Sequence, residues 1–271
     1  MSNEHAVAMR RLPIYLLLDC SGSMAGEPIA AMGMGLKALL SDLRNDPQAL
    51  ETVWLSVIVF SSTAEQLLPL TDINEFDPPE LVASGTTALG EAIELLAERI
   101  SDEVRHSSLE QKGDWRPMVF ILTDGEPTDD WMKSVERFRL RNQATLIACG
   151  AGPEVNDRTL KLLGDTVVRL RDTQPGTLGA FMKWVTASVT TTSQVLGACA
   201  RADGQLAEIP DEEGISVLVE KGVASVTAGE FLDELHLSDG LQKERGCKDA
   251  PNADPLVGPK AIAEGDGHGK Q

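Results

Sequence analysis

Short apolar runs alternate with amphipathic stretches from residue 12 to about residue 192, and this alternation constrains the fold more than any other feature. The runs, each typical of a strand buried on both faces of a parallel sheet, are residues 12–18, 53–60, 118–122, 144–148 and 167–170. Between them, apolar residues recur at helical spacing, as at Ile29, Met32 and Leu36. The pattern predicts an α/β fold: a Rossmann-like, doubly wound, mostly parallel sheet with helices on both faces.

One pair of runs breaks the parallel pattern. Only Ser61, Ser62 and Thr63 separate residues 53–60 from a second run at residues 64–70. A parallel crossover needs a dozen or more residues, so this connection is too short for one. We therefore expect an antiparallel hairpin, with residues 64–70 as one antiparallel edge strand.

The chain of 271 residues divides by composition into four parts. Residues 1–11 read as a flexible amino-terminal arm, and residues 12–200 as the α/β domain. Residues 201–238 are expected to form a weakly ordered extension, with a candidate strand at residues 215–219. Residues 239–271 have no aromatic side chain and many Gly, Pro, Asp and Lys residues, which predicts a disordered tail.

Charge and cysteine content exclude several classes of protein. A net charge of −18 argues against nucleic acid, whose phosphates would be repelled unless the fold hides a basic face, and against docking on anionic lipid. No apolar run approaches the ~20 residues that a membrane-spanning helix needs. The cysteines at positions 20, 149, 199 and 247 are widely spaced, so neither a zinc site nor a disulfide framework is expected. A cytoplasmic location fits this pattern.

Oxygen-bearing side chains gather where two of the predicted strands end. Asp19, Ser21 and Ser23 follow the first strand, and Asp124 follows the strand at residues 118–122. Thr87 precedes a predicted helix. Carboxylates and hydroxyls are hard ligands that suit Mg²⁺, with Mn²⁺ and Ca²⁺ as alternatives. If the two strands are neighbours, the sequence predicts one metal site at that edge, with Asp19 and Asp124 binding directly or through water.

Few direct carboxylates would leave the ion with residual positive charge and one exchangeable position. An acidic residue of a protein partner could fill that position. Each segment alone also fits a plainer interpretation, since Asp-x-Ser often caps a helix and Thr-Asp-Gly is a common turn. Asp129 and Asp130, next along the chain, are expected to cap the helix that follows them, or less plausibly to tune the rim of the site.

Three motifs in order, Asp19-Cys20-Ser21-Gly22-Ser23, then Gly85-Thr86-Thr87-Ala88-Leu89-Gly90, then Leu122-Thr123-Asp124-Gly125, closely resemble the von Willebrand factor A (VWA) domain. Proteins of that family carry a metal-ion-dependent adhesion site (MIDAS) with the pattern Asp-x-Ser-x-Ser, a distant Thr and a distant Asp. The resemblance implies the metal ligands Asp19, Ser21, Ser23, Thr87 and Asp124. Thr87 is preferred to Thr86 because the family's usual Gly-Gly-Thr-x-Leu-Gly places its threonine there.

Within that family, the amino-terminal residues Arg11-Leu12-Pro13-Ile14-Tyr15 are similar to those of the bacterial TerY family, associated with tellurium resistance. This similarity implies an adaptor in a stress-signalling system, alongside a Ser/Thr kinase and a PP2C-type phosphatase. Some relatives carry a cysteine-rich zinc ribbon, for which this chain lacks the paired cysteines.

The competing hypothesis is a Mg²⁺-dependent phosphatase-like or other hydrolytic enzyme. Haloacid-dehalogenase-type phosphatases also place Asp at the end of a first strand, but they need a second Asp two residues later, where this chain has Ser21. A cysteine phosphatase would need Arg where Gly26 stands. The four histidines suggest no catalytic triad, and no Gly-x-x-x-x-Gly-Lys phosphate loop is present. We therefore expect a binding protein and no enzyme.

Overall fold

Seven strands form one sheet at the centre of the computed structural model, which describes residues 10–108, 112–198, 206–208 and 214–220. The strand order across the sheet is β3-β2-β1-β4-β5-β6-β7. In chain order the strands are β1 (Leu12–Asp19), β2 (Val53–Phe60), β3 (Ala64–Asp72), β4 (Met118–Thr123), β5 (Thr145–Ala151), β6 (Thr166–Leu170) and β7 (Ile215–Glu220). All eight residues of β1 are buried, as expected for a strand at the middle of a sheet covered on both faces.

The strand pairing confirms the predicted fold class. β1 lies parallel to both β2 and β4, and β4, β5 and β6 continue in parallel. The predicted hairpin is present, because β3 pairs antiparallel with β2. The expectation of a single antiparallel edge is incomplete, since β7 pairs antiparallel with β6 at the other edge. That second edge coincides with the candidate strand at residues 215–219.

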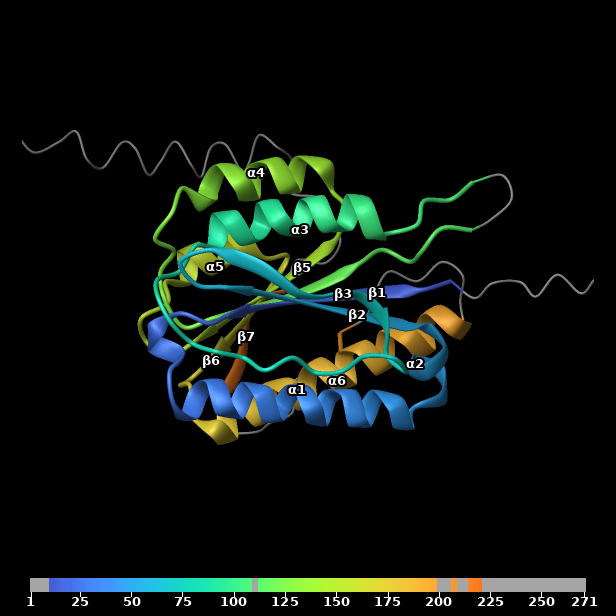
Figure 1. The fold of residues 1–271 in the computed structure, drawn as a ribbon, viewed down its shortest axis with the longest axis horizontal. Helices are drawn as coiled ribbons and strands as arrows, with labels where there is room; N and C mark the ends of the chain where they lie inside the picture. The colour runs from blue at the N-terminus through green and yellow to red at the C-terminus, as the bar shows by residue number, and fades with distance from the viewer. Residues whose placement is uncertain (1–9, 109–111, 199–205, 209–213, 221–271) are drawn as a thin grey trace, which may run out of the picture. The chain divides into compact units, whose positions relative to one another are not determined.

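Helices cover both faces of the sheet (Figure 1). On one face lie α1 (Glu27–Asn45), α2 (Pro47–Thr52) and α6 (Pro175–Ala198); on the other lie α3 (Leu89–Glu103), α4 (Trp131–Arg141) and α5 (Asp157–Leu163). The sequence did not predict α2, which has only six residues and depends on a local cap: the Asp46 carboxylate accepts the Ala49 N–H at 2.8 Å. A short 3₁₀ turn, η1 (Gly22–Met24), follows β1.

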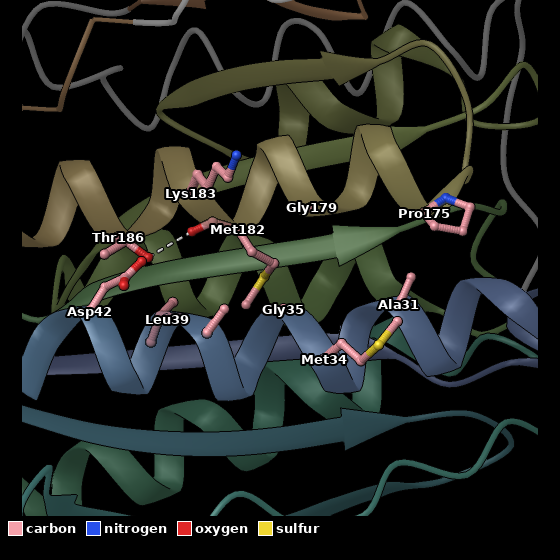
Figure 2. Close-up of a pocket in the computed structure, with 11 residues that line it drawn as sticks. Ala31, Met34, Gly35, Leu39, Asp42, Pro175, Gly179, Met182, Lys183 and Thr186 are labelled. Atoms are coloured by element: carbon pink, nitrogen blue, oxygen red, sulfur yellow. Dashed lines mark hydrogen bonds between the residues drawn. The ribbon is translucent and has the colours of Figure 1, made fainter.

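The larger core lies between the sheet and the layer of α1 and α6. There Phe120 of β4 meets Trp184 of α6 edge to face, with ring centroids 6.0 Å apart. The two helices approach closely because α1 has glycine at position 35, where a Cβ atom would lie 2.5 Å from Met182 Cγ. Figure 2 shows the Met182 side chain directed towards Gly35. Both residues line a groove of about 260 Å³ between the two helices.

The predicted boundaries of the four parts stay predictions. β1 begins at Leu12 and α6 ends at Ala198, close to the limits expected for the α/β domain. Most of the arm and all of the predicted tail (residues 239–271) lie outside the described residues. Among the helices of the described residues, none is both long and apolar enough to cross a membrane.

Candidate metal centre

Asp19 and Asp124 lie on the same side of the sheet, where the parallel strands end, because β1 and β4 are parallel neighbours. The register pairs Leu18 with Leu122, so the two strands end side by side. Asp19 is fully buried and Asp124 is 8% exposed. This meets the condition on which the predicted site depended: the two strands are neighbours, and both carboxylates lie at the carboxyl ends of the strands, where ligands of such sheets bind.

Both oxygens of Asp19 accept hydrogen bonds. Oδ1 accepts the backbone N–H of Ser21 at 2.8 Å, and Oδ2 accepts the hydroxyl of Thr123 at 2.6 Å. Thr123 is buried and was not among the predicted site residues. Its position as the last residue of β4, opposite Asp19 in register, is the signal that could have identified it.

The hydroxyls of Ser21 and Ser23 connect the first motif to Asp124. The two Oγ atoms lie 3.0 Å apart, and Ser23 donates to Asp124 Oδ1 at 2.7 Å. The structure therefore brings together Asp19, Ser21, Ser23 and Asp124, as the sequence predicted. That they bind a metal stays a prediction.

Thr87, and not Thr86, lies near this cluster. A Cβ atom placed on Gly125 would lie 3.7 Å from Thr87 Oγ1, so that hydroxyl is next to the turn after Asp124. Thr87 is buried, whereas Thr86 is exposed. Thr86 also contacts a different partner, since its hydroxyl donates to Ser62 Oγ at 3.4 Å. Of the two threonines, Thr87 is therefore the one beside the cluster, and its role as the fifth ligand stays a prediction.

Backbone hydrogen bonds hold the contributing loops together. Ser84 N–H donates to the Cys20 carbonyl at 2.7 Å, and Gly22 N–H donates to the Gly85 carbonyl at 3.0 Å. Gly85 has a φ of 76°, and a Cβ there would lie 2.3 Å from Ser62 Oγ, so only glycine fits this approach. The loop before Thr87 is thereby fixed against the loop that carries Ser21 and Ser23.

The segment after Asp124 holds the other side of Thr87. Thr128 accepts the Thr87 N–H on its Oγ1 at 3.2 Å and donates its own N–H to the Thr87 carbonyl at 2.9 Å. Asp129 accepts the N–H groups of Gly90 and Glu91, each at 3.0 Å. Asp130 is the N-cap residue of α4, as the sequence predicted, but its side chain makes no cap bond and pairs with Lys133 at 2.6 Å. The side chain of Asp129 instead caps α3.

The electrostatics of the two carboxylates fit a cation. Burial raises the pKa of Asp19 above its ordinary value; hydrogen bonds from Thr123 and Ser21 oppose this shift, and the charge of Asp124 reinforces it. Burial likewise raises the pKa of Asp124 against the bond from Ser23. Neither carboxylate forms an ion pair with a Lys, Arg or His side chain in the described part of the chain. Buried charges without a protein partner are costly unless a cation binds them.

The candidate donors are two carboxylates and the hydroxyls beside them. Among residues that the structure describes, no group of three or more His, Cys, Asp or Glu side chains could hold a metal, so the hydroxyls would have to complete the ligand set. Oxygen donors alone suit hard divalent ions. The residues present therefore fit the ion that the sequence implied.

Comparisons with known proteins agree with this fold. The family model of the von Willebrand factor type A domain matches residues 14–172. A von Willebrand factor type A structure from Catenulispora acidiphila is similar at 20% identity and a TM-score of 0.50, covering 67% of this chain and 43% of that one. Proximal thread matrix protein 1 from the mussel byssus is similar at 18% identity and a TM-score of 0.51, covering 66% and 47%.

The pilus adhesin SpaC of Lactobacillus rhamnosus GG, in an open conformation, is similar at 14% identity and a TM-score of 0.53, covering 68% of this chain and 30% of the adhesin. The chain spans less than half the length of each of these structures. No curated protein matches it in sequence.

Proposed function

This chain belongs to the von Willebrand factor type A family, and from that membership we propose that it is a metal-dependent protein-interaction module. Domains of this family commonly bind proteins through a MIDAS. The observation that carries the proposal is the pair of buried carboxylates, Asp19 and Asp124, linked through the hydroxyls of Ser21 and Ser23 and lacking a basic partner among the described side chains.

Asp19, Ser21, Ser23, Thr87 and Asp124 are the residues that would hold the ion. Mg²⁺ is the proposed ion, and Mn²⁺ or Ca²⁺ would suit the same oxygens. When bound, the ion supplies a positive centre to which an acidic side chain of a partner can bind. This matters in a chain of net charge −18, which would otherwise repel such a partner, because a bound cation reverses the local sign of the potential.

We also propose the cellular setting that the amino-terminal motif implies: a cytoplasmic adaptor of the TerY type in bacterial tellurium resistance and stress signalling. Its partners would be a Ser/Thr kinase and a PP2C-type phosphatase. The support is the similarity of residues 11–15 and the wide spacing of the cysteines. Co-expression of the chain with such a kinase and phosphatase, followed by co-purification in Mg²⁺ and in EDTA, tests this assignment.

The proposal includes that the chain is not an enzyme. The purified protein is expected to show no phosphatase or ATPase turnover in Mg²⁺. Turnover that disappears in Asp19→Asn would instead support the hydrolytic alternative.

The central test separates metal binding from partner binding. Calorimetric titration with Mn²⁺ should show one site in the wild type and none in Asp124→Ala, and capture of a protein partner should require Mg²⁺ and be lost in Ser21→Ala and Asp124→Ala. Capture that is unchanged by EDTA and by both substitutions would reject metal-mediated binding and leave a general scaffold.

A further inference from the structure

A second concavity, distinct from the groove between α1 and α6, lies where the parallel strands begin, next to the start of β4. The predicted metal centre lies where these strands end. The concavity has a volume of about 360 Å³ and is formed by the end of α3, the segment entering β4 and the end of α4. Its polar lining includes Arg105, His106, Arg116, Arg141 and Gln143. Three arginines therefore contribute to the lining of one hollow in a chain whose net charge is −18.

None of these three arginines is neutralised by a described carboxylate. Arg116 donates only to neutral acceptors: the Thr145 hydroxyl at 3.1 Å, the Asn142 carbonyl and side-chain oxygen at 3.0 and 2.6 Å, and the Ala144 carbonyl at 2.6 Å. Arg105 has its guanidinium 5.9 Å from the ring of Trp54. Within the described residues, neither Arg105 nor Arg141 forms an ion pair.

Among the described lining residues, the one acidic residue, Asp114, is already neutralised. Its side chain is 2% exposed and accepts two bonds from Arg11, at 2.9 and 2.5 Å. It also accepts the backbone N–H of Arg105 at 2.7 Å. The Asp114–Arg11 pair contributes no net charge, so the concavity keeps the positive charge of its three arginines.

The base of the concavity is a fixed piece of backbone. Gly113 approaches residues 105–107 so closely that a Cβ would lie 2.5 Å from the Ser107 nitrogen and 2.7 Å from the Arg105 carbonyl oxygen. Arg10 holds the segment that includes Gly113 and Trp115: it donates to the Gly113 carbonyl at 2.7 Å, and its guanidinium lies 3.5 Å from the centroid of the Trp115 ring. Arg105 and the segment entering β4 are thereby held in one arrangement.

We propose that this concavity binds a phosphate monoester. A phosphate monoester carries nearly two negative charges and three acceptor oxygens, and guanidinium groups bind it with matched geometry. A hollow of this size is within the range of small-ligand pockets. An extended nucleic acid fits less well, because the net charge of the chain is −18 and these three arginines line a single hollow.

The test titrates the full chain calorimetrically in EDTA, so that a divalent ion at the predicted metal centre plays no part. The probes are inorganic phosphate, a phosphoserine peptide, the same peptide unphosphorylated and a short oligonucleotide. Arg105→Gln and Arg141→Gln remove guanidiniums that make no hydrogen bond to described residues, so the fold should survive both changes. Each should weaken binding of the phosphorylated probes about tenfold, because a charge-assisted hydrogen bond is lost. Arg137→Gln, one turn earlier on α4 and paired with Glu94, is the matched control and should bind like the wild type.

Tighter binding of the phosphopeptide than of phosphate would identify a phosphorylated protein as the source of the group, and the reverse would identify free phosphate or a small phosphate compound; either supports the site. The proposal is overturned if the wild type binds neither phosphorylated probe, if the unphosphorylated peptide binds equally well, if Arg137→Gln weakens binding as much as Arg105→Gln, or if an oligonucleotide binds more tightly than both.

Discussion

The hydroxyl of Thr123 is the contact that orients Asp19, since the other bond to that carboxylate comes from the backbone of its own loop. Replacing Thr123 by Val keeps the shape and removes the donor. Because the bond is made to a buried carboxylate, Thr123→Val should lower the free energy of unfolding by about 1.5–3 kcal/mol. Urea denaturation in EDTA measures this.

Thr71→Val is the control for that change. Its hydroxyl donates to the Pro69 carbonyl in an exposed position, so the loss should stay within about 0.5 kcal/mol. Equal losses in the two variants would mean that the Thr123–Asp19 bond has no special weight.

Adjacent threonines at positions 86 and 87 offer a second test at the scale of single side chains. Thr87→Ala should weaken Mn²⁺ binding roughly 10–100-fold, the usual range for losing a group that supports a metal. Thr86→Ala should leave the affinity unchanged, because its hydroxyl contacts Ser62 instead. Calorimetric titration of both variants decides between them, and the opposite ranking would contradict the ligand set.

Among the elements, the packing of α1 on α6 depends on Gly35 and not on Gly33. Gly35→Leu should lower the free energy of unfolding by about 1–3 kcal/mol, because the new side chain must displace Met182. Gly33→Ala, on the same helix with no atom within 4 Å of its Cβ position, should raise it by about 0.5–1 kcal/mol. Thermal and urea unfolding would show the opposite signs; a Gly35→Leu variant as stable as the wild type would show that the two helices can shift apart.

The start of α6 carries a pH-dependent contribution from Asp172. Its carboxylate accepts the Thr177 hydroxyl at 2.7 Å and the Gln174 N–H at 3.1 Å, and these bonds, the first above all, hold its pKa below the ordinary value. A lowered pKa in the folded state stabilises the fold above the unfolded-state pKa, and this contribution is lost as the pH falls through the folded-state pKa.

Asp172→Asn should therefore lower the free energy of unfolding at pH 7 by roughly 0.5–1.5 kcal/mol, the usual net value of a hydrogen bond. The difference from the wild type should shrink in strong acid. Urea denaturation at both pH values checks the sign, and a difference that grows in acid would contradict it.

Periodicity predicted the elements well where they were long and apolar, and poorly where they depend on distant contacts. β1 and α3 followed directly from their apolar patterns. α6 continues to Ala198, beyond the expected end near residue 192. The role of Asp129 could not be predicted, because it caps a helix 39 residues earlier in the chain and sequence patterns report only local caps.

At the scale of the whole molecule, an ion at the predicted centre should stabilise the fold. A ligand that binds only the folded state adds about 2.7 kcal/mol at 100 times its Kd. Adding Mn²⁺ should therefore raise the melting temperature of the wild type, and EDTA should reverse the shift. Asp124→Ala should melt at the same temperature with and without the ion; an equal rise in this variant would mean that the metal binds elsewhere.

The two candidate sites, at opposite ends of the parallel strands, differ in how far the sequence could predict them. The cluster of Asp19, Ser21, Ser23 and Asp124 could be predicted because both of its motifs directly follow apolar strands and parallel strands end together. The arginine-lined concavity could not, since Arg105, Arg116 and Arg141 come from three segments and the overall charge of −18 conceals a local positive cluster.

Because β1 and β4 are neighbours in the sheet but distant in the chain, the residues of the predicted metal centre come together late in synthesis. Asp19 and Thr123, which bond to each other, are 104 residues apart. At a translation rate of about 5–20 residues per second, a growing polypeptide carries the first motif for roughly 5–20 s before the last one exists. The proposed binding of a partner at this site therefore requires β4 to be in place beside β1, so a nascent chain that ends before Thr123 is expected not to bind.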